Sequence, residues 1–293
     1  MARARYKSAG EALAAISRKI GTRAKLEFAE EYCNSDTHPL KTNIQKIIVG
    51  GAVLCPICES IKNSAIVSEQ QSKIHAHSEK KRVQDYLFQN SLLTDKSLFQ
   101  SGFKNFIAED VSSEEYVNKN KAIEAYKQYD AGEAFNTLLV GSPGAGKSHL
   151  AMAIARSLNE KKDGQAKCLF IKVDDLMSAI RETFRDDYQG GDGERYYTQM
   201  LINADFLVLD DLGAESGSMT TSKQATNFVH RILYAVLDGR QETGTIITSN
   251  LALDEMVDIY DTKIISRLFR NKYVIDFSNI HDKRVGDIVF KKP

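Results

Sequence analysis

The sequence of 293 residues lacks a net charge, a long apolar run and an internal repeat. Its 39 basic residues balance 39 acidic ones, so the average charge does not indicate a nucleic-acid or membrane partner. The longest apolar stretch, Ile47 to Ile57, is interrupted by glycines and a proline and is far shorter than the about 20 residues that span a bilayer. No apolar segment follows the basic N-terminus, so no export signal is evident. We therefore expect a cytoplasmic protein without a membrane partner.

Cysteine is also scarce, and three of the four cysteines lie in one N-terminal stretch. In a reducing compartment, so few cysteines indicate free thiols or metal ligands before disulfides. Cys55 and Cys58 form a C-x₂-C pair with Cys33 and His38 upstream, and two pairs of soft ligands suit tetrahedral Zn²⁺. We expect a structural zinc site, with His38 as its least constrained ligand. A redox pair and unligated thiols are the alternatives, and Cys168 is expected in the core.

The length of the chain suits one domain of about 150–200 residues and a smaller one. A polar run from Glu59 to Asn90 has few apolar side chains, and these fall loosely at helical spacing. This pattern predicts an exposed connector helix. We therefore expect a zinc-binding region over residues 1–60, a helical connector over 61–105 and an α/β domain over 106–293.

The second part of the chain alternates strand-like and helix-like segments. Apolar runs predict strands at Asn136–Val140, Cys168–Val173, Phe206–Leu209, Thr245–Ser249 and Val274–Phe277. Helical spacing predicts helices at Ser148–Leu158, Asp174–Phe184 and Ser222–Leu237. Apolar strands separated by helices are typical of a parallel sheet that is buried on both faces.

A phosphate-binding loop follows the first of these strands. Eight residues fit the pattern G-x-x-x-x-G-K-[ST] at every fixed position: Gly141, Ser142, Pro143, Gly144, Ala145, Gly146, Lys147 and Ser148. The glycines let several backbone N–H groups point at one phosphate, and the dipole of the following helix adds to the attraction. We expect Lys147 to reach the β- and γ-phosphates of ATP and Ser148 to bind Mg²⁺, with His149 among the nucleotide contacts.

Two carboxylates follow the strand Phe206–Leu209, at the end where open α/β sheets bind ligands. We expect Asp210 to hold Mg²⁺ and Asp211 to act as general base toward the attacking water. The alternative is that both acids only cap the next helix. Asn250 ends the following strand and could hydrogen-bond the attacking water or the γ-phosphate, although an asparagine in this place is usually a turn residue.

The region from about Phe103 to Arg284 resembles the bacterial DnaC/DnaI-type helicase loaders and the related IstB transposition helpers. The resemblance rests on Gly102–Phe106, Ala204–Glu215, Gly239–Leu251, Ile264–Leu268 and Asp282–Arg284. It implies an AAA+ P-loop domain with a parallel sheet flanked by helices. Some loaders also have a Cys/His pair and a later Cys-Pro-x-Cys ahead of this domain, with a narrower first pair than the one here.

The resemblance also implies roles that spacing alone does not show. Arg267 would insert as an arginine finger into the ATP site of a neighbouring subunit, with Arg270 as a further candidate, and Arg284 would contact the γ-phosphate within its own subunit. The protein would self-associate, hydrolyse ATP weakly alone, bind a hexameric replicative helicase and deliver it onto single-stranded DNA. The alternatives are an IstB-like transposition helper and an ATP-switched adaptor or inhibitor with little hydrolysis.

Overall fold

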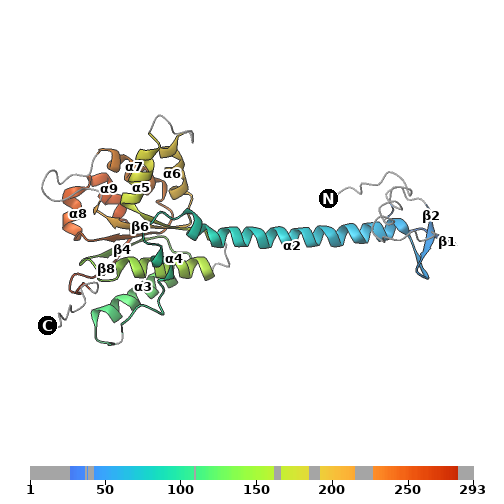
Figure 1. The fold of residues 1–293 in the computed structure, drawn as a ribbon, viewed down its shortest axis with the longest axis horizontal. Coiled ribbons are helices and arrows are strands. Elements are labelled where there is room, and N and C mark those ends of the chain that lie inside the picture. The colour runs from blue at the N-terminus through green and yellow to red at the C-terminus, as the bar shows by residue number, and fades with distance from the viewer. Residues whose placement is uncertain are drawn as a thin grey trace, which may run out of the picture. The chain divides into compact units, whose positions relative to one another are not determined.

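The computed structural model describes residues 27–36, 38, 43–108, 110–161, 166–184, 192–214 and 227–282. The chain forms two compact units, Met1–Ser78 and Glu79–Pro293 (Figure 1). Each unit contains a sheet of its own, with three strands in the first and five in the second. Among the helices within the described ranges, none combines the length and the apolar character that crossing a bilayer requires.

The first unit contains an antiparallel sheet in the order β1-β2-β3. Its strands are β1 (Glu27–Cys33), β2 (Ile44–Val49) and β3 (Ala52–Leu54). β2 and β3 are joined at Gly50 and Gly51, which both have positive φ and therefore favour glycine. Of the residues in these three strands, only Ala29 and Ile47 are buried. The strands therefore carry little core signal, and they were not predicted from the sequence.

One helix, α2 (Pro56–Asn90), contributes residues to both units. Proline is favourable at its first position because the N–H that proline lacks would have no partner inside the helix. Every side chain from Ser64 to Glu79 is exposed, which confirms the predicted exposed helix. Near the other end, Leu87 is fully buried in the core of the second unit.

The second unit is built on a parallel sheet in the order β5-β6-β7-β4-β8. Its strands are β4 (Asn136–Val140), β5 (Cys168–Lys172), β6 (Phe206–Leu212), β7 (Thr245–Ser249) and β8 (Lys272–Asp276). The predicted parallel sheet is confirmed. β7 lies between β6 and the P-loop strand β4, which is the strand order of an AAA+ P-loop domain.

Helices cover both faces of this sheet (Figure 1). One face packs against α5 (Val173–Glu182), α6 (Gly193–Ile202), α7 (Asn227–Gly239), α8 (Leu253–Ile259) and α9 (Thr262–Leu268). The other face packs against the end of α2, α3 (Glu114–Asp130) and α4 (Lys147–Lys161). Apolar side chains on both faces of each central strand therefore find a partner, as a buried parallel sheet requires.

Several element boundaries differ from the predicted ones. β6 continues to Leu212, so Asp210 and Asp211 lie inside the strand and not after it. β8 ends at Asp276, which leaves Phe277 outside the strand. The helices α3, α6 and α8 were not predicted: polar residues dominate α3, and α6 and α8 are short, with 10 and 7 residues. α7 is described from Asn227 onward, and the earlier part of that predicted helix lies outside the described residues.

Candidate functional site

The P-loop joins β4 to α4 and has three glycines in a conformation that other residues rarely adopt. Gly141, Gly144 and Gly146 have φ values of 117°, 69° and 96°. A side chain at Gly141 would overlap the backbone that follows β8, and one at Gly146 would overlap the ring of Phe106. Residues other than glycine would therefore be strained at these positions, and the loop is closely packed. Both features fix the positions of its N–H groups.

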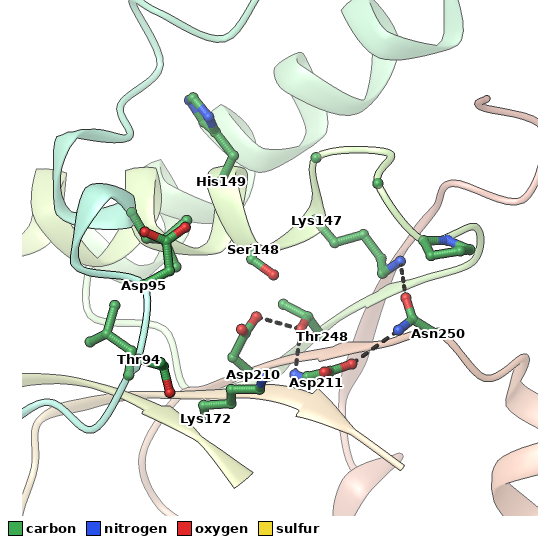
Figure 2. A pocket seen from close by; sticks show the side chains of 15 residues that line it. Thr94, Asp95, Lys147, Ser148, His149, Lys172, Asp210, Asp211, Thr248 and Asn250 are labelled. Carbon is green, nitrogen blue, oxygen red and sulfur yellow. Dashed lines mark hydrogen bonds between the residues drawn. The ribbon is translucent and has the colours of Figure 1, made fainter. Parts of the chain in front are cut away.

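Lys147 is buried, with 6% of its surface exposed, and its amine turns back over the loop. Nζ donates hydrogen bonds to the carbonyl oxygens of Gly141 and Ser142 and to Oδ1 of Asn250, each at 2.7 Å. Figure 2 shows the amine between the loop and Asn250. A cation beside a cradle of N–H groups is suited to bind a phosphate.

β6 has a bulge at its two acidic residues. Between Leu209 and Leu212, β6 contains one residue more than the paired part of β7. Asp211 accommodates it with a φ of 61°, in the left-handed region. Such conformations are costly for residues other than glycine and cluster at functional sites. As a result, Asp210 is buried and Asp211 is half-buried at the edge of the pocket.

Thr248, near the end of β7, connects the two acidic residues. Its hydroxyl accepts a hydrogen bond from the Asp211 backbone N–H at 2.9 Å and donates one to Oδ1 of Asp210 at 2.7 Å. Burial raises the pKa of the Asp210 carboxyl, and the hydrogen bonds from Thr248 and Ser148 act against that rise. Thr248 was not identified from the sequence, since a threonine inside a buried strand gives no signal.

Asn250 lies between the P-loop lysine and the second acid. Its Nδ2 donates to Oδ1 of Asp211 at 3.0 Å, while its Oδ1 accepts from Lys147. The two ends of the amide thus have different partners, which orients the side chain. The predicted residues Lys147, Asp210, Asp211 and Asn250 are therefore brought together at one edge of the sheet (Figure 2).

These side chains line a pocket of about 650 Å³, a volume suited to a small-molecule ligand. Part of its lining comes from the segment that follows α2, through Leu93, Thr94, Asp95 and Leu98. This segment is attached to the sheet, because the Leu92 N–H donates to the Phe170 carbonyl at 3.0 Å and the Lys172 N–H donates to the Leu92 carbonyl at 2.8 Å. No motif marks these residues, and the sequence did not identify them.

His149 also lines the pocket, but its ring nitrogen binds protein atoms. Nε2 lies 3.1 Å from the carbonyl oxygen of Gly102 and 3.1 Å from Oδ1 of Asn105, so it carries the proton and donates. Burial lowers the pKa of the imidazole, which favours its neutral form. The side chain thus ties the segment before α3 to the start of α4. The predicted nucleotide contact of His149 stays a prediction.

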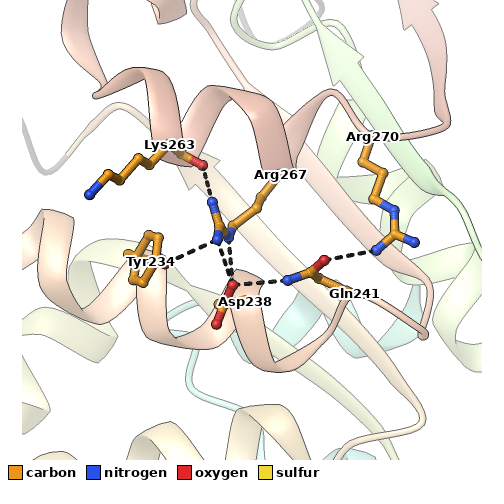
Figure 3. A network of polar contacts seen from close by, with 6 residues as sticks. All are labelled: Tyr234, Asp238, Gln241, Lys263, Arg267 and Arg270. Carbon is orange, nitrogen blue, oxygen red and sulfur yellow. Dashed lines mark hydrogen bonds and ion pairs between the residues drawn. The ribbon is translucent and has the colours of Figure 1, made fainter.

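Arg267, at the end of α9, is bound within its own subunit (Figure 3). Nε and Nη2 donate to Oδ1 of Asp238 at 2.8 and 2.6 Å, and Nη1 donates to the Lys263 carbonyl at 2.9 Å. The guanidinium also lies over the Tyr234 ring, 4.3 Å from its centroid, and bonds the phenol oxygen at 3.0 Å. Arg267 and the pocket residues therefore do not meet within the described part of one subunit.

The two other predicted arginines differ in what the structure describes. Arg270 is more exposed than Arg267, and its Nη1 donates to Oε1 of Gln241 at 3.1 Å (Figure 3). Arg284 lies outside the described residues. Two residues earlier, Asp282 lies against the P-loop, where a side chain at Gly144 would overlap its carboxylate.

A second candidate site lies in the first unit, where the ligand atoms of Cys33, His38, Cys55 and Cys58 all fall within 4.8 Å of one another. Nε2 of His38 is 3.3 Å from Sγ of Cys55 and of Cys58, and the Sγ atoms of Cys33 and Cys58 are 3.8 Å apart. A tetrahedron with Zn–S bonds of about 2.3 Å has edges of about 3.8 Å, whereas a disulfide needs about 2.05 Å. The donor set therefore fits tetrahedral Zn²⁺.

Two elements and two connections supply these ligands: Cys33 ends β1, His38 lies between β1 and β2, Cys55 lies between β3 and α2, and Cys58 is in the first turn of α2. His38, the least constrained ligand in the sequence, is only 3% exposed and is thus buried beside the cysteines. Burial raises the pKa of the Cys55 thiol to about 11, whereas a hydrogen bond from the Ser35 backbone lowers that of Cys33.

Several known proteins are similar to this chain. Residues 75–274 match the family model of the IstB-like ATP-binding proteins. The chain is 31% identical over 149 residues to the replicative helicase loader DnaC of Escherichia coli strain K12, which covers 51% of this chain and 56% of that protein. The DnaC loader of Buchnera aphidicola from Acyrthosiphon pisum is 28% identical over 159 residues, 53% of this chain and 59% of that protein. The chain spans about half the length of the curated relatives it matches. A crystal structure of DnaI superposes with a TM-score of 0.49 at 20% identity, over 64% of this chain and 95% of that one.

Proposed function

Since the chain belongs to the family of IstB-like ATP-binding proteins, we propose that it is an ATP-dependent helicase loader. In this proposal it binds a hexameric replicative helicase, delivers it onto single-stranded DNA during replication initiation, and hydrolyses ATP. The observation that carries the proposal is a P-loop site with Lys147, Asp210, Asp211 and Asn250 in a chain similar to a replicative helicase loader. We expect hydrolysis to be weak alone and to increase with DNA or with the helicase.

The residues of the pocket that the sequence motifs identified have proposed roles in hydrolysis. The P-loop N–H groups would hold the β-phosphate, and Lys147 would exchange its carbonyl partners for phosphate oxygens. Ser148 and Asp210 offer a hydroxyl and a carboxylate to Mg²⁺, which neutralises phosphate charge when bound. Asp211 would accept the proton of the attacking water, with Asn250 holding its carboxylate. Because aspartate is shorter than the glutamate of many ATPases, slow hydrolysis is expected.

Self-association would complete this site. Arg267 would act in trans, exchanging its bonds to Asp238 and Tyr234 for the γ-phosphate of a neighbouring subunit. An arginine finger neutralises charge that develops during phosphoryl transfer and is worth about 10³–10⁵ in rate in GTPases. Arg284 would contact the γ-phosphate in its own subunit, and the position of Asp282 over the P-loop supports this.

We propose that the first unit holds structural Zn²⁺ and docks the helicase. Its described strands bury few apolar side chains, and metal binding contributes about 10–16 kcal/mol to the folding of small zinc peptides. The same strands expose Phe28, Tyr32 and Val53, at 59%, 57% and 44%. Apolar surface of this kind is suited to contact a protein partner.

For the DNA contact we propose a group of aromatic and cationic side chains in the second unit. Phe184 is 57% exposed, and its ring packs edge-on against Phe228 with the centroids 5.9 Å apart. The guanidinium carbons of Arg181 and Arg231 lie 5.5 and 5.7 Å from the Phe228 centroid. Arg231 also pairs with Glu194 at 2.6 Å, so the net positive charge of the group is that of one arginine. Rings beside cations are the chemistry by which proteins bind single-stranded nucleic acids.

An IstB-like transposition helper is the second candidate, because the matching family model is named for IstB. Its nucleotide site would be the same, and its partner would be a transposase. An ATP-switched adaptor or inhibitor is the third, since Asp211 replaces the usual glutamate. The substitution Asp211→Asn would leave an adaptor intact but would stop a hydrolysing loader from recycling.

The experiment that tests the proposal mixes the protein with a bacterial replicative helicase and MgATP and weighs the complexes by native mass spectrometry. A chain that starts at Glu79 serves for comparison, because it keeps Leu87 and the rest of the core of the second unit. A discrete complex that needs residues 1–78 would support the loader and its docking unit. If helicases from several hosts form no complex, the transposition helper becomes the better proposal and a transposase the next partner to test.

A further inference from the structure

The hydroxyl of Thr248 has no part in the roles described above, although it touches both acidic residues of the pocket. It accepts from the Asp211 backbone N–H at 2.9 Å and donates to Oδ1 of Asp210 at 2.7 Å. Thr248 is 1% exposed and Asp210 is 7% exposed, so bulk water does not compete for these bonds. One buried side chain therefore links the backbone of one acid to the carboxylate of the other.

The direction of this hydrogen-bonded chain is fixed by its two ends. A backbone N–H can only donate, and an ionised carboxylate can only accept. The hydroxyl must therefore give its own proton to Asp210 while its oxygen accepts from Asp211. Valine, which has the same shape, can do neither, and serine can do both.

The bulge explains why a hydroxyl is needed at this place. The extra residue in β6 leaves the Asp211 N–H bonded to a side chain and not to the backbone of β7. Asp211 then has a φ of 61°, and its carboxylate meets Nδ2 of Asn250 at 3.0 Å. Asn250 in turn contacts Lys147 at 2.7 Å (Figure 2). The hydroxyl of Thr248 is thus the hydrogen-bond acceptor that holds the backbone N–H of Asp211 in its left-handed conformation.

We propose that Thr248 is a positioning residue for ATP hydrolysis, which sets the place of the Asp211 carboxylate relative to Asp210 and Asn250. This inference rests on the proposed ATPase function. Thr248 lines the pocket, but the bonds described above join its hydroxyl to Asp210 and Asp211 and not to a residue of the P-loop. Loss of the Thr248 hydroxyl is expected to displace the Asp211 carboxylate from the position in which it can accept a proton from the attacking water. Nucleotide binding by the P-loop is expected to persist.

The test compares Thr248→Val with Thr248→Ser and with the control Thr137→Val. Thr137 is a fully buried threonine of the neighbouring strand β4, and its hydroxyl bonds Tyr129 at 2.8 Å, outside the pocket. MgATP affinity is measured with a fluorescent nucleotide, hydrolysis is measured with single-stranded DNA present, and thermal unfolding checks the fold. If Thr248→Val does not fold, Thr248→Ala takes its place, because it leaves room for a water molecule.

We expect kcat of Thr248→Val to fall about 10- to 100-fold, as displaced catalytic groups do, with MgATP affinity at saturating Mg²⁺ within about threefold of the unsubstituted protein. Thr248→Ser should recover most of kcat, and Thr137→Val should change it little. Equal losses in Thr248→Val and Thr137→Val, or no recovery in Thr248→Ser, would overturn the inference.

A lack of hydrolysis by the unsubstituted protein would instead count against the proposed ATPase function. The inference is then tested by the Mg²⁺ concentration that half-saturates nucleotide binding, because Thr248 also holds Asp210. That concentration should rise several-fold in Thr248→Val but not in Thr248→Ser or Thr137→Val. An unchanged value in Thr248→Val would overturn the inference independently of hydrolysis.

Discussion

The two units of this chain are held together by different kinds of interaction. In the described strands of the first unit only Ala29 and Ile47 are buried, and a cluster of three cysteines and a histidine lies beside them. The second unit packs helices on both faces of a parallel sheet. Burial of apolar surface stabilises by about 25 cal/mol per Å², so a layered core can order a domain unaided. We infer that the first unit needs its metal and that the second does not.

The largest expected effect is the loss of the first unit when its metal ligands are removed. In the double variant Cys55→Ser, Cys58→Ser, bound zinc should fall from one ion to none, and the strands β1 to β3 should lose protection from hydrogen exchange. The reason is that structural zinc contributes about 10–16 kcal/mol to the folding of small zinc domains. ATP binding by the second unit should persist, as measured by nucleotide titration.

Cys168→Ala is the matched control, because Cys168 is fully buried in β5 of the second unit. It should keep the zinc and lower only the thermal stability of the second unit. The comparison between the units fails if the double variant keeps its zinc or loses ATP binding together with the order of the first unit.

The next largest expected effect is on ATP hydrolysis by the second unit. It tests whether Arg267 acts in the ATP site of a neighbouring subunit. We expect Arg267→Ala and Lys147→Ala each to reduce hydrolysis by about 10³-fold or more, the lower end of the effect of arginine fingers. A mixture of the two should recover part of the rate, since one subunit supplies an intact pocket and the other an intact finger. Steady-state hydrolysis of the mixture is the measurement.

Arg270→Ala tests the further finger candidate, because Arg270 lies near Arg267 but bonds only exposed partners in the described residues. If Arg267 is the finger, Arg270→Ala should keep most of its hydrolysis. If the mixture stays inactive although both variants assemble, Arg267 serves its own subunit, where it already binds Asp238 and Tyr234.

The sequence predicted most of the second unit and little of the first for the same physical reason. β4, β5 and β7 are short apolar runs because both faces of their sheet are buried, and four of the five residues of β5 are fully buried. β1 to β3 bury only Ala29 and Ile47, so their sequence gives little sign of a core-facing strand. The metal ligands were nevertheless evident, because the geometry of a zinc site demands particular residue types at close spacing.

Within the pocket, the sequence identified the residues that belong to a motif and not those that the fold brings to them. Lys147 and Asp210 have a fixed spacing or context, whereas Thr248 acts through a bulge that local sequence does not reveal. Leu93 and Asp95 reach the pocket because Leu92 pairs with β5, a contact between distant segments. Such pairings depend on tertiary structure, and a single sequence carries no local sign of them.

A smaller effect is expected where α2 enters the core of the second unit. Leu87 is fully buried beside the side chains of α4, so Leu87→Ala should destabilise this unit by about 2–5 kcal/mol. Chemical unfolding followed together with ATP binding measures the change. Gln89→Ala, at an exposed position of the same helix, should have little effect. Equal stability of the two variants would mean that the end of α2 does not belong to the core of this unit.

The smallest expected effect is on the affinity for single-stranded DNA, and it tests which of the two units binds DNA. Phe184→Ala should weaken binding of single-stranded DNA by about 1–3 kcal/mol, the value of one base stacked on an aromatic ring, or about 5- to 150-fold in affinity. Fluorescence anisotropy with a labelled oligonucleotide measures the change. Val257→Ala is the control, because Val257 is similarly exposed, at 53%, but lies on α8. The double cysteine variant should bind DNA as tightly as the unsubstituted protein. If it loses DNA binding and Phe184→Ala does not, the DNA contact belongs to the metal-dependent unit and not to the one with the layered core.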